Sequence, residues 1–107
     1  MILISKYIIA KGYLGMALFP FIFLRSKKLI KYKILINHEK IHLRQQLELL
    51  VLPFYIIYMI EFCIKLFRHG DWKRAYALIS FEKEAYANES NLKFLQKRPF
   101  WNFMRYF

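Results

Sequence analysis

Cysteine is almost absent from this chain, since Cys63 is the single one among 107 residues. One cysteine cannot form an internal disulfide, which excludes the disulfide framework of many small secreted proteins. Cys63 lies in an apolar run, residues 60–67, and we expect it to be a small residue of the core. The sequence also contains no internal repeat and no low-complexity segment.

Long hydrophobic runs are missing as well. The longest apolar stretch, residues 49–60, is interrupted by Pro53 and closed by Glu61, and it falls short of the roughly 20 residues that cross a bilayer. Residues 1–10 lack a basic segment ahead of a small-residue cleavage site, so no signal peptide is predicted. We expect a protein of the cytoplasm, or one bound peripherally to the inner membrane.

Acidic residues are scarce: 7 Asp and Glu face 18 Lys and Arg, which gives a net charge of +11. The chain carries no helix-turn-helix, zinc-finger or RNA-recognition signature, so a nucleic-acid partner is not expected. The composition is 58% hydrophobic and 20% aromatic, and the basic residues are spread among apolar stretches. This mixture favours an anionic membrane surface as partner, although a basic surface can also simply keep an apolar protein soluble.

The motif HEKIH, residues 38–42, is the strongest functional signal in the sequence. HExxH on a helix places His38 and His42 one turn apart on one face, where both imidazoles can bind one Zn²⁺ ion. Glu39 lies beside them and can act as general base toward a water molecule. Zinc peptidases usually have an uncharged residue where this chain has Lys40, which is compatible with the motif if Lys40 points to solvent.

A third protein ligand is needed for such a site, and three glutamates compete for the role. Glu61 fits the HExxH-x18-E spacing, but it lies in an apolar setting that is typical of a packed helix. Glu82 shares a helix face with Ala85, which would let two helices approach closely. Glu84 points about half a turn away and is expected to be a surface acid or to support a ligand.

Three motifs in order, NHEKIHLRQQ, PFYIIY and SFEKEAYANE, resemble a group of small bacterial zinc metallopeptidase-like proteins with HExxHxxQ and FErEAY motifs. The resemblance covers roughly residues 15–100. More distantly, the sequence is similar to the membrane-linked gluzincin peptidases of the CAAX-prenyl-protease and heat-shock-protease kind. The resemblance implies that Glu82 is the third zinc ligand, and Tyr86 stands where the distant families have Asp.

Other residues near these motifs are candidates for supporting roles. Tyr86 or Tyr76 could stabilise the oxyanion of a hydrolytic reaction, although either could equally be a core aromatic. Gln46 lies four residues after His42 on the same helix face and could orient a ligand, or it could be an ordinary surface residue.

The expected fold is α+β: a short N-terminal β-hairpin followed by three or four helices in one minimal zincin-like domain, residues 1–107. Residues 13–25 read as a strand with Pro20 at an edge or bulge, paired with residues 29–35, although a helix over 14–24 also fits. The expected helices and caps are residues 38–52 with Asn37 as N-cap, residues 54–68 closed by Gly70, and residues 81–90 capped by Ser80. Residues 91–107 are expected to pack over the core or to lie on a membrane.

The sequence therefore favours a zinc-dependent metallopeptidase-like hydrolase acting on a peptide or protein substrate. Residues 16–24 are the candidate edge strand for binding that substrate. Two alternatives stay open: a zinc-binding protein without catalytic function, in which the metal stabilises a small domain, and a basic membrane-associated protein in which the motif is accidental.

Overall fold

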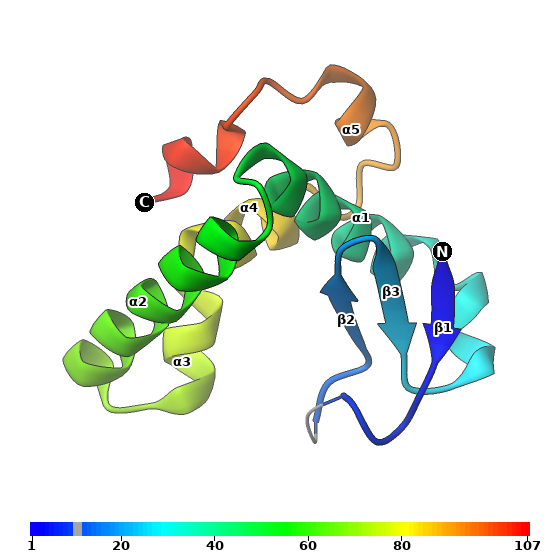
Figure 1. The fold of residues 1–107 in the computed structure, drawn as a ribbon, viewed down its shortest axis with the longest axis horizontal. Helices are drawn as coiled ribbons and strands as arrows, with labels where there is room; N and C mark the ends of the chain where they lie inside the picture. Colours follow the sequence, from blue (N-terminus) through cyan, green and yellow to red (C-terminus); the bar gives the residue numbers. More distant parts are fainter. Residues whose placement is uncertain (10–11) are drawn as a thin grey trace.

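A three-stranded sheet forms the N-terminal part of the computed structural model, which describes residues 1–9 and 12–107. The strands are β1 (Ile2–Ile4), β2 (Gly15–Leu18) and β3 (Phe21–Leu24). β3 lies in the centre, parallel to β1 and antiparallel to β2. Five α-helices follow the sheet (Figure 1), and the predicted α+β class is confirmed.

The predicted strand pairing is wrong. The hairpin forms within residues 13–25, because the chain reverses at the exposed Phe19–Pro20 step and β3 returns beside β2. Proline has no N–H for a β-ladder, and the turn is where that loss has no consequence. Residues 29–35, the expected second strand, are helical instead: the 3₁₀ helix η1 (Lys27–Lys31) leads directly into the next helix.

Helix α1 (Lys33–Glu48) carries the HEKIH motif and begins earlier than predicted. Asn37 is not its N-cap but lies inside the helix with its side chain buried. The Asn37 amide donates hydrogen bonds of 2.9 Å to the carbonyl oxygens of Glu89 and Asn91. Asn37 therefore supplies hydrogen-bond donors to backbone carbonyls that follow the helix ending at Asn88. A capping pattern in the local sequence cannot indicate such a tertiary contact.

The turn after α1 reverses the chain without glycine. Leu50 and Val51 both have positive φ angles, and the Val51 N–H bonds to the Gln46 carbonyl while the Leu50 N–H bonds to that of Leu47. These two bonds form a Schellman motif, whose left-handed position is usually glycine. Val51 (φ 62°, ψ −69°) then centres a strained γ-turn, closed by a 2.7 Å bond from the Leu52 N–H to the Leu50 carbonyl.

Helix α2 (Leu52–His69) starts directly after this turn, with Pro53 in its first turn, where no N–H is required. Gly70 ends it with φ 67°, as predicted. Among the described residues, no single helix is long and apolar enough to cross a membrane; α1 and α2 meet that criterion only as a pair, bent by 113° at the turn.

The remaining helices are α4 (Ser80–Asn88), which was predicted, and α3 (Trp72–Ala77) and α5 (Phe94–Lys97), which were not. Ser80 is not the N-cap of α4 but its first residue, after Ile79. The Ser80 N–H and hydroxyl both donate to the Glu61 carboxylate of α2, at 2.9 and 2.6 Å. Glu61 thus caps α4 from a neighbouring helix.

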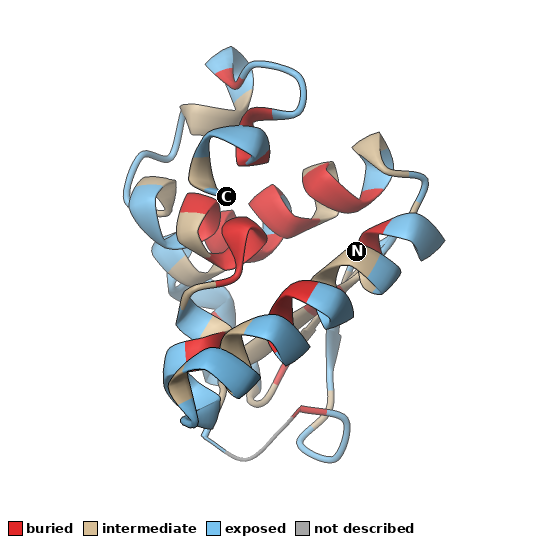
Figure 2. Ribbon diagram, turned by 90° about the vertical axis from the view of Figure 1, so that its left-hand side faces the viewer, coloured by how far each residue is buried: buried red, intermediate tan, exposed pale blue. Residues whose placement is uncertain are grey.

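The C-terminal segment packs over the core rather than extending away. The 3₁₀ helix η2 (Asn102–Tyr106) places Phe103 against Phe81, with ring centroids 4.8 Å apart. Phe103 belongs to a buried cluster with Phe54, Phe62, Ala75, Ile79 and Phe81, and a second cluster beneath the sheet contains Ile22, Leu24 and Leu29. Figure 2 shows the buried residues gathered in the middle of the molecule. Cys63, predicted to be in the core, is exposed.

The positive φ at Leu50 predicts that glycine is better there. Because Leu50 is 79% exposed, Leu50→Gly removes little packing and relieves backbone strain, so the free energy of unfolding should rise by about 1 kcal/mol. Leu47→Gly is the matched control, because Leu47 is also exposed but lies within α1, where glycine should lower the same quantity by about 1 kcal/mol. Urea denaturation measures the free energy of unfolding of both variants. Equal changes in Leu50→Gly and Leu47→Gly would contradict the turn geometry.

Candidate metal centre

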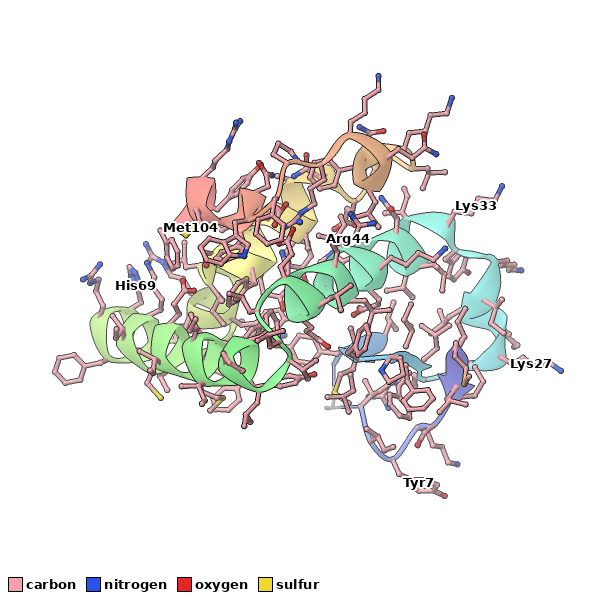
Figure 3. The ribbon with its side chains drawn as sticks, turned by 45° about the horizontal axis from the view of Figure 1, so that its top comes forward. Tyr7, Lys27, Lys33, Arg44, His69 and Met104 are labelled. Carbon is pink, nitrogen blue, oxygen red and sulfur yellow. The ribbon has the colours of Figure 1, made fainter. Side chains whose placement is uncertain are left out.

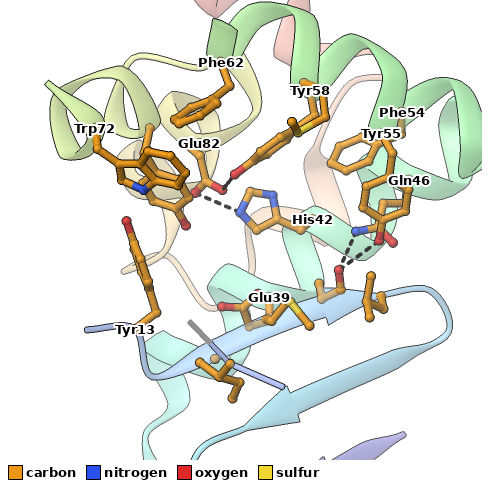
Figure 4. A pocket seen from close by; sticks show the side chains of 17 residues that line it. Tyr13, Glu39, His42, Gln46, Phe54, Tyr55, Tyr58, Phe62, Trp72 and Glu82 are labelled. Atoms are coloured by element: carbon orange, nitrogen blue, oxygen red, sulfur yellow. Dashed lines mark hydrogen bonds and ion pairs between the residues drawn. The ribbon is translucent and has the colours of Figure 1, made fainter. Parts of the chain in front are cut away.

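Three side chains from two helices converge in the interior. α1 supplies His38 and His42 one turn apart, and α4 supplies Glu82. Figure 4 shows Glu82 facing His42. His42 Nε2 lies 3.1 Å from Glu82 Oε1 and 3.2 Å from His38 Nε2, and His38 Nε2 lies 3.3 Å from the same oxygen. All three side chains are buried. This group could hold a metal ion.

The triangle of donor atoms has the size that a tetrahedral metal ion requires. Zn²⁺ binds histidine nitrogen and carboxylate oxygen at about 2.0–2.1 Å, so two ligand atoms of a tetrahedron lie about 3.3 Å apart. The three separations here, 3.1 to 3.3 Å, match one face of such a tetrahedron. The donor set therefore has the separations that a tetrahedral ion such as Zn²⁺ requires, and it supplies three of the four ligands from the part of the chain that the structure describes.

His42 is held in the tautomer that metal binding needs. Its Nδ1 lies 2.8 Å from Gln45 Oε1. The Gln45 amide nitrogen donates to Glu84 Oε1 at 2.8 Å and to the Phe81 carbonyl at 3.1 Å, which fixes the amide oxygen toward His42. An amide oxygen only accepts, so Nδ1 carries the proton and the Nε2 lone pair points into the site.

His38 is oriented in the same way by a different partner. Its Nδ1 lies 3.1 Å from Glu89 Oε1, and a carboxylate acceptor places the proton on Nδ1. The Tyr86 ring packs edge-on against the His38 ring, with centroids 4.5 Å apart. Both histidines therefore present unprotonated Nε2 atoms to one point when they are neutral.

Glu82 uses its two oxygens differently. Oε1 faces the histidines, while Oε2 accepts a 2.7 Å hydrogen bond from the Tyr58 hydroxyl of α2. Burial and the adjacent Glu82 charge raise the pKa of Tyr58, so it stays a donor. This bond leaves one Glu82 oxygen for a metal ion.

The electrostatics of the metal-free site favour a positive charge between the three groups. Burial alone would lower the pKa of His42, but the Glu82 carboxylate outweighs it and raises this pKa to about 9. Burial would raise the pKa of Glu82, yet the charges and hydrogen bonds of His42 and His38 hold it well below its usual range. A bound cation would replace the proton that His42 otherwise retains.

Behind His42 lies a buried polar network that reaches the C-terminal segment. Glu84 is fully buried and accepts hydrogen bonds from Arg98 Nε at 2.6 Å, Arg98 Nη2 at 3.0 Å and Asn102 at 2.9 Å, besides that from Gln45. Arg98 also donates to Glu48 at 2.6 Å. Burial opposes the charged form of Arg98, but its hydrogen bonds to Glu84 and Glu48 raise its pKa. Glu84 is therefore no surface acid: it holds Gln45, which holds His42.

Glu39 lies on the cleft side of the same helix turn. Its carboxylate is buried, and its Oε2 would lie 3.2 Å from a Cβ added at Gly15 of β2. The lack of a side chain at Gly15 thus makes room for Glu39. Burial raises the pKa of Glu39, while the charges of His42 and His38 oppose that shift. Lys40, the unusual residue of the motif, is exposed to solvent.

A cleft of about 350 Å³ opens beside the three donors, with Glu39, His42 and Glu82 in its wall. The remaining lining is almost wholly apolar and comes from β2 with Tyr13 on one side and from α2 and α3 on the other (Figure 4). Tyr76 of α3 is in this wall, and its hydroxyl interacts with those of Tyr58 and Tyr86. A ligand in the cleft would meet charged or metal-binding groups where Glu39, His42 and Glu82 lie, and tyrosine side chains, including that of Tyr76, over much of the remaining wall.

The structure brings most of the candidate residues together, with exceptions. Glu61 is engaged by Ser80 and is not part of the converging group. The hydrogen-bond partner of His42 is Gln45, whereas the Gln46 amide bonds to the β2 segment: it donates to the Ala17 carbonyl at 2.9 Å and accepts from the Phe19 N–H at 2.7 Å. Tyr86 contacts His38 through its ring and is half exposed.

Three supporting residues escaped the sequence reasoning: Gln45, Glu89 and Tyr58. Gln45 follows His42 by three residues, so its spacing was as suitable as that of Gln46. Glu89 shares a helix face with Glu82, which was a usable signal. No local pattern marks Tyr58, because its contact with Glu82 depends on how α2 packs on α4.

Comparison of the chain with protein-family models, with curated proteins and with solved structures finds no match. The case for the site therefore rests on its own geometry.

Zinc content should distinguish the competing glutamates. Glu82→Gln removes a charged ligand, so the variant should retain far less zinc than the wild type after zinc loading and dialysis, as should His42→Ala. Glu61→Gln is the matched control: it should lower the free energy of unfolding by about 1–3 kcal/mol, through the weakened α4 cap, and keep the metal. Elemental mass spectrometry measures the content; zinc retained by Glu82→Gln and lost by Glu61→Gln would refute the assignment.

The two adjacent glutamines should also behave differently. Gln45→Met frees the His42 ring to rotate and change tautomer, so zinc affinity should fall about 10- to 100-fold. Gln46→Met disturbs the contact with β2 but leaves His42 held, so affinity should stay within about threefold. Competition with a chromophoric chelator measures both constants. Equal losses in the two variants would show that Gln45 has no specific role.

Proposed function

We propose that the protein is a zinc-dependent metallopeptidase-like hydrolase, with His38, His42 and Glu82 as the metal ligands. The observation that carries the proposal is that the Glu39 carboxylate lies in the wall of the same cleft as two of these ligands. A purely structural zinc site is usually closed by four protein ligands, whereas three ligands beside an open cleft are typical of a catalytic one. The HEKIH motif and its spacing to FEKEAY, which place these ligands and Glu39 in the sequence, are consistent with the same proposal.

The chemistry follows from the positions of the side chains. A bound zinc ion supplies Lewis-acid activation of water and of a substrate carbonyl. Glu39 accepts the proton of the attacking water and can pass it to the leaving amine, a task for which its raised pKa is suited. Burial and the neighbouring Glu82 charge also raise the pKa of Tyr76, so this residue stays protonated and can donate to a developing oxyanion.

Tyr76 is the better oxyanion donor of the two tyrosines considered. It is in the wall of the cleft, whereas Tyr86 packs its ring against His38 and interacts with Tyr76. Tyr86 would then position His38 and Tyr76 rather than touch the substrate. In this arrangement Tyr76, and not Tyr86, stabilises the oxyanion.

The cleft suits a peptide with bulky apolar side chains. β2 is an edge strand, and residues 15–18 form one wall of the cleft. The Ala17 carbonyl faces away from β3, since Gln46 and Tyr55 donate to it, and Gly15 presents its backbone groups to the same side. A peptide can pair with the backbone groups of Gly15, because the Ala17 carbonyl is already occupied, and can place apolar side chains in the aromatic part of the cleft.

Glu39→Gln tests the catalytic proposal. The change keeps the size of the side chain but removes the base, so peptide cleavage should fall at least about 100-fold while zinc stays bound. The assay incubates the zinc-loaded protein with a mixed peptide pool and identifies the cleavage sites by mass spectrometry. We expect these sites to lie next to bulky apolar residues. Lys40→Gln, at the adjacent exposed position, is the control and should retain activity.

Two outcomes would contradict the proposal. Cleavage by Glu39→Gln at the wild-type rate would show that the activity does not come from this site. A zinc-loaded wild type that cleaves nothing would leave a zinc-binding protein, in which the metal joins α1 to α4 and stabilises the fold.

A further inference from the structure

Helix α2 exposes an apolar stripe along its whole outer side. Phe67 is 94% exposed and Leu52 68% exposed, and between them Ile56, Met59, Ile60 and Ile64 are each about half exposed. Cys63 adds an exposed sulfur at the same side. A helix on the surface of a globular protein normally turns polar residues outward, so this stripe requires an explanation.

The stripe is continuous because its members recur every three or four residues. From Leu52 to Phe67 it extends over about 22 Å, at about 1.5 Å per residue. The opposite face of α2 is occupied: Phe54 and Phe62 are buried in the core, and Glu61 caps α4. α2 can therefore contact an apolar medium with one side only, which fits a helix lying along an interface rather than crossing a bilayer.

Basic residues surround the far end of the stripe. Lys65 and Arg68 lie in the last turns of α2, and Lys73 and Arg74 follow in α3, against one exposed acid, Asp71. Figure 3 shows His69 at this end of the molecule, with Lys27 and Lys33 at the other end. Trp72, an aromatic residue of the kind enriched at membrane interfaces, is 61% exposed at the same junction.

We propose that the outer face of α2 docks onto an anionic lipid bilayer, with the helix parallel to the surface. The apolar stripe enters the boundary between headgroups and acyl chains, while the four basic residues meet lipid phosphates. Charge decides between this partner and a second copy of the chain. Two chains that each carry a net charge of +11 repel each other, whereas the same charge attracts an anionic surface.

Docking would bring the metal centre close to the lipid. Met59 is half exposed and also lines the cleft, so one edge of the cleft lies beside the docked stripe. The docking proposal does not depend on catalysis, because neither the stripe nor its basic residues belong to the metal site. Failure of either proposal can thus be recognised separately.

Vesicle sedimentation with the full chain tests the proposal. Wild type should bind phosphatidylcholine vesicles that contain phosphatidylglycerol, bind vesicles of phosphatidylcholine alone far more weakly, and lose affinity as salt increases. Phe67→Asp and Ile64→Asp should each weaken binding at least about tenfold, because they place charge in the apolar stripe. Arg68→Ser with Arg74→Ser should weaken it roughly tenfold and flatten the salt dependence.

Ile34→Asp is the matched control for the apolar substitutions. Ile34 is 46% exposed but lies at the start of α1, away from α2, so this variant should bind like wild type. His42→Ala should also bind, which separates docking from metal binding. Circular dichroism establishes that each variant is folded.

Three results would overturn the proposal. The first is that the wild-type protein does not bind anionic vesicles. The second is that the Phe67→Asp and Ile64→Asp variants bind these vesicles as tightly as the wild type. The third is a dimer in solution that Phe67→Asp dissociates, because the stripe would then be covered by a second chain.

Discussion

The buried carboxylate of Glu84 is the contact on which the rest of this structure depends. It joins three parts of the chain: Gln45 from α1, its own helix α4, and the C-terminal segment through Arg98 and Asn102. A fully buried carboxylate is costly unless charged and neutral donors satisfy it, and here four hydrogen bonds do so. Because Gln45 also holds His42, the packing of the C-terminal segment and the orientation of a candidate metal ligand belong to one polar network.

The candidate site accordingly consists of more than three ligands. Each ligand has an outer partner on another element or turn: Gln45 for His42, Glu89 for His38 and Tyr58 for Glu82. These partners select the lone pairs that face the site, so its geometry is set by hydrogen bonds before any ion binds. The same arrangement concentrates charge in an apolar interior, as the shifted pKa values of His42 and Glu82 indicate.

The sequence was informative where chemistry is local and less so where it depends on packing. The i, i+4 spacing of His38 and His42 and the helix stop at Gly70 follow from one helix each, and both agree with the structure. Asn37 and Ser80 lie inside their helices rather than at the predicted N-cap positions, and their side chains bond to tertiary partners that no local pattern indicates. The exposed face of α2 could not be located, since an apolar run does not reveal which of its sides the core will cover.

Two hydrogen bonds described above also bear on how the chain limits association through the β2 edge of its sheet. An open β-edge next to an apolar cleft is a template on which other chains can add strands and aggregate. The Ala17 carbonyl at that edge is already bonded to Gln46 at 2.9 Å and to Tyr55 at 3.1 Å. An incoming strand can therefore form only a short ladder near Gly15, which is enough to hold one segment briefly and too little to propagate a sheet.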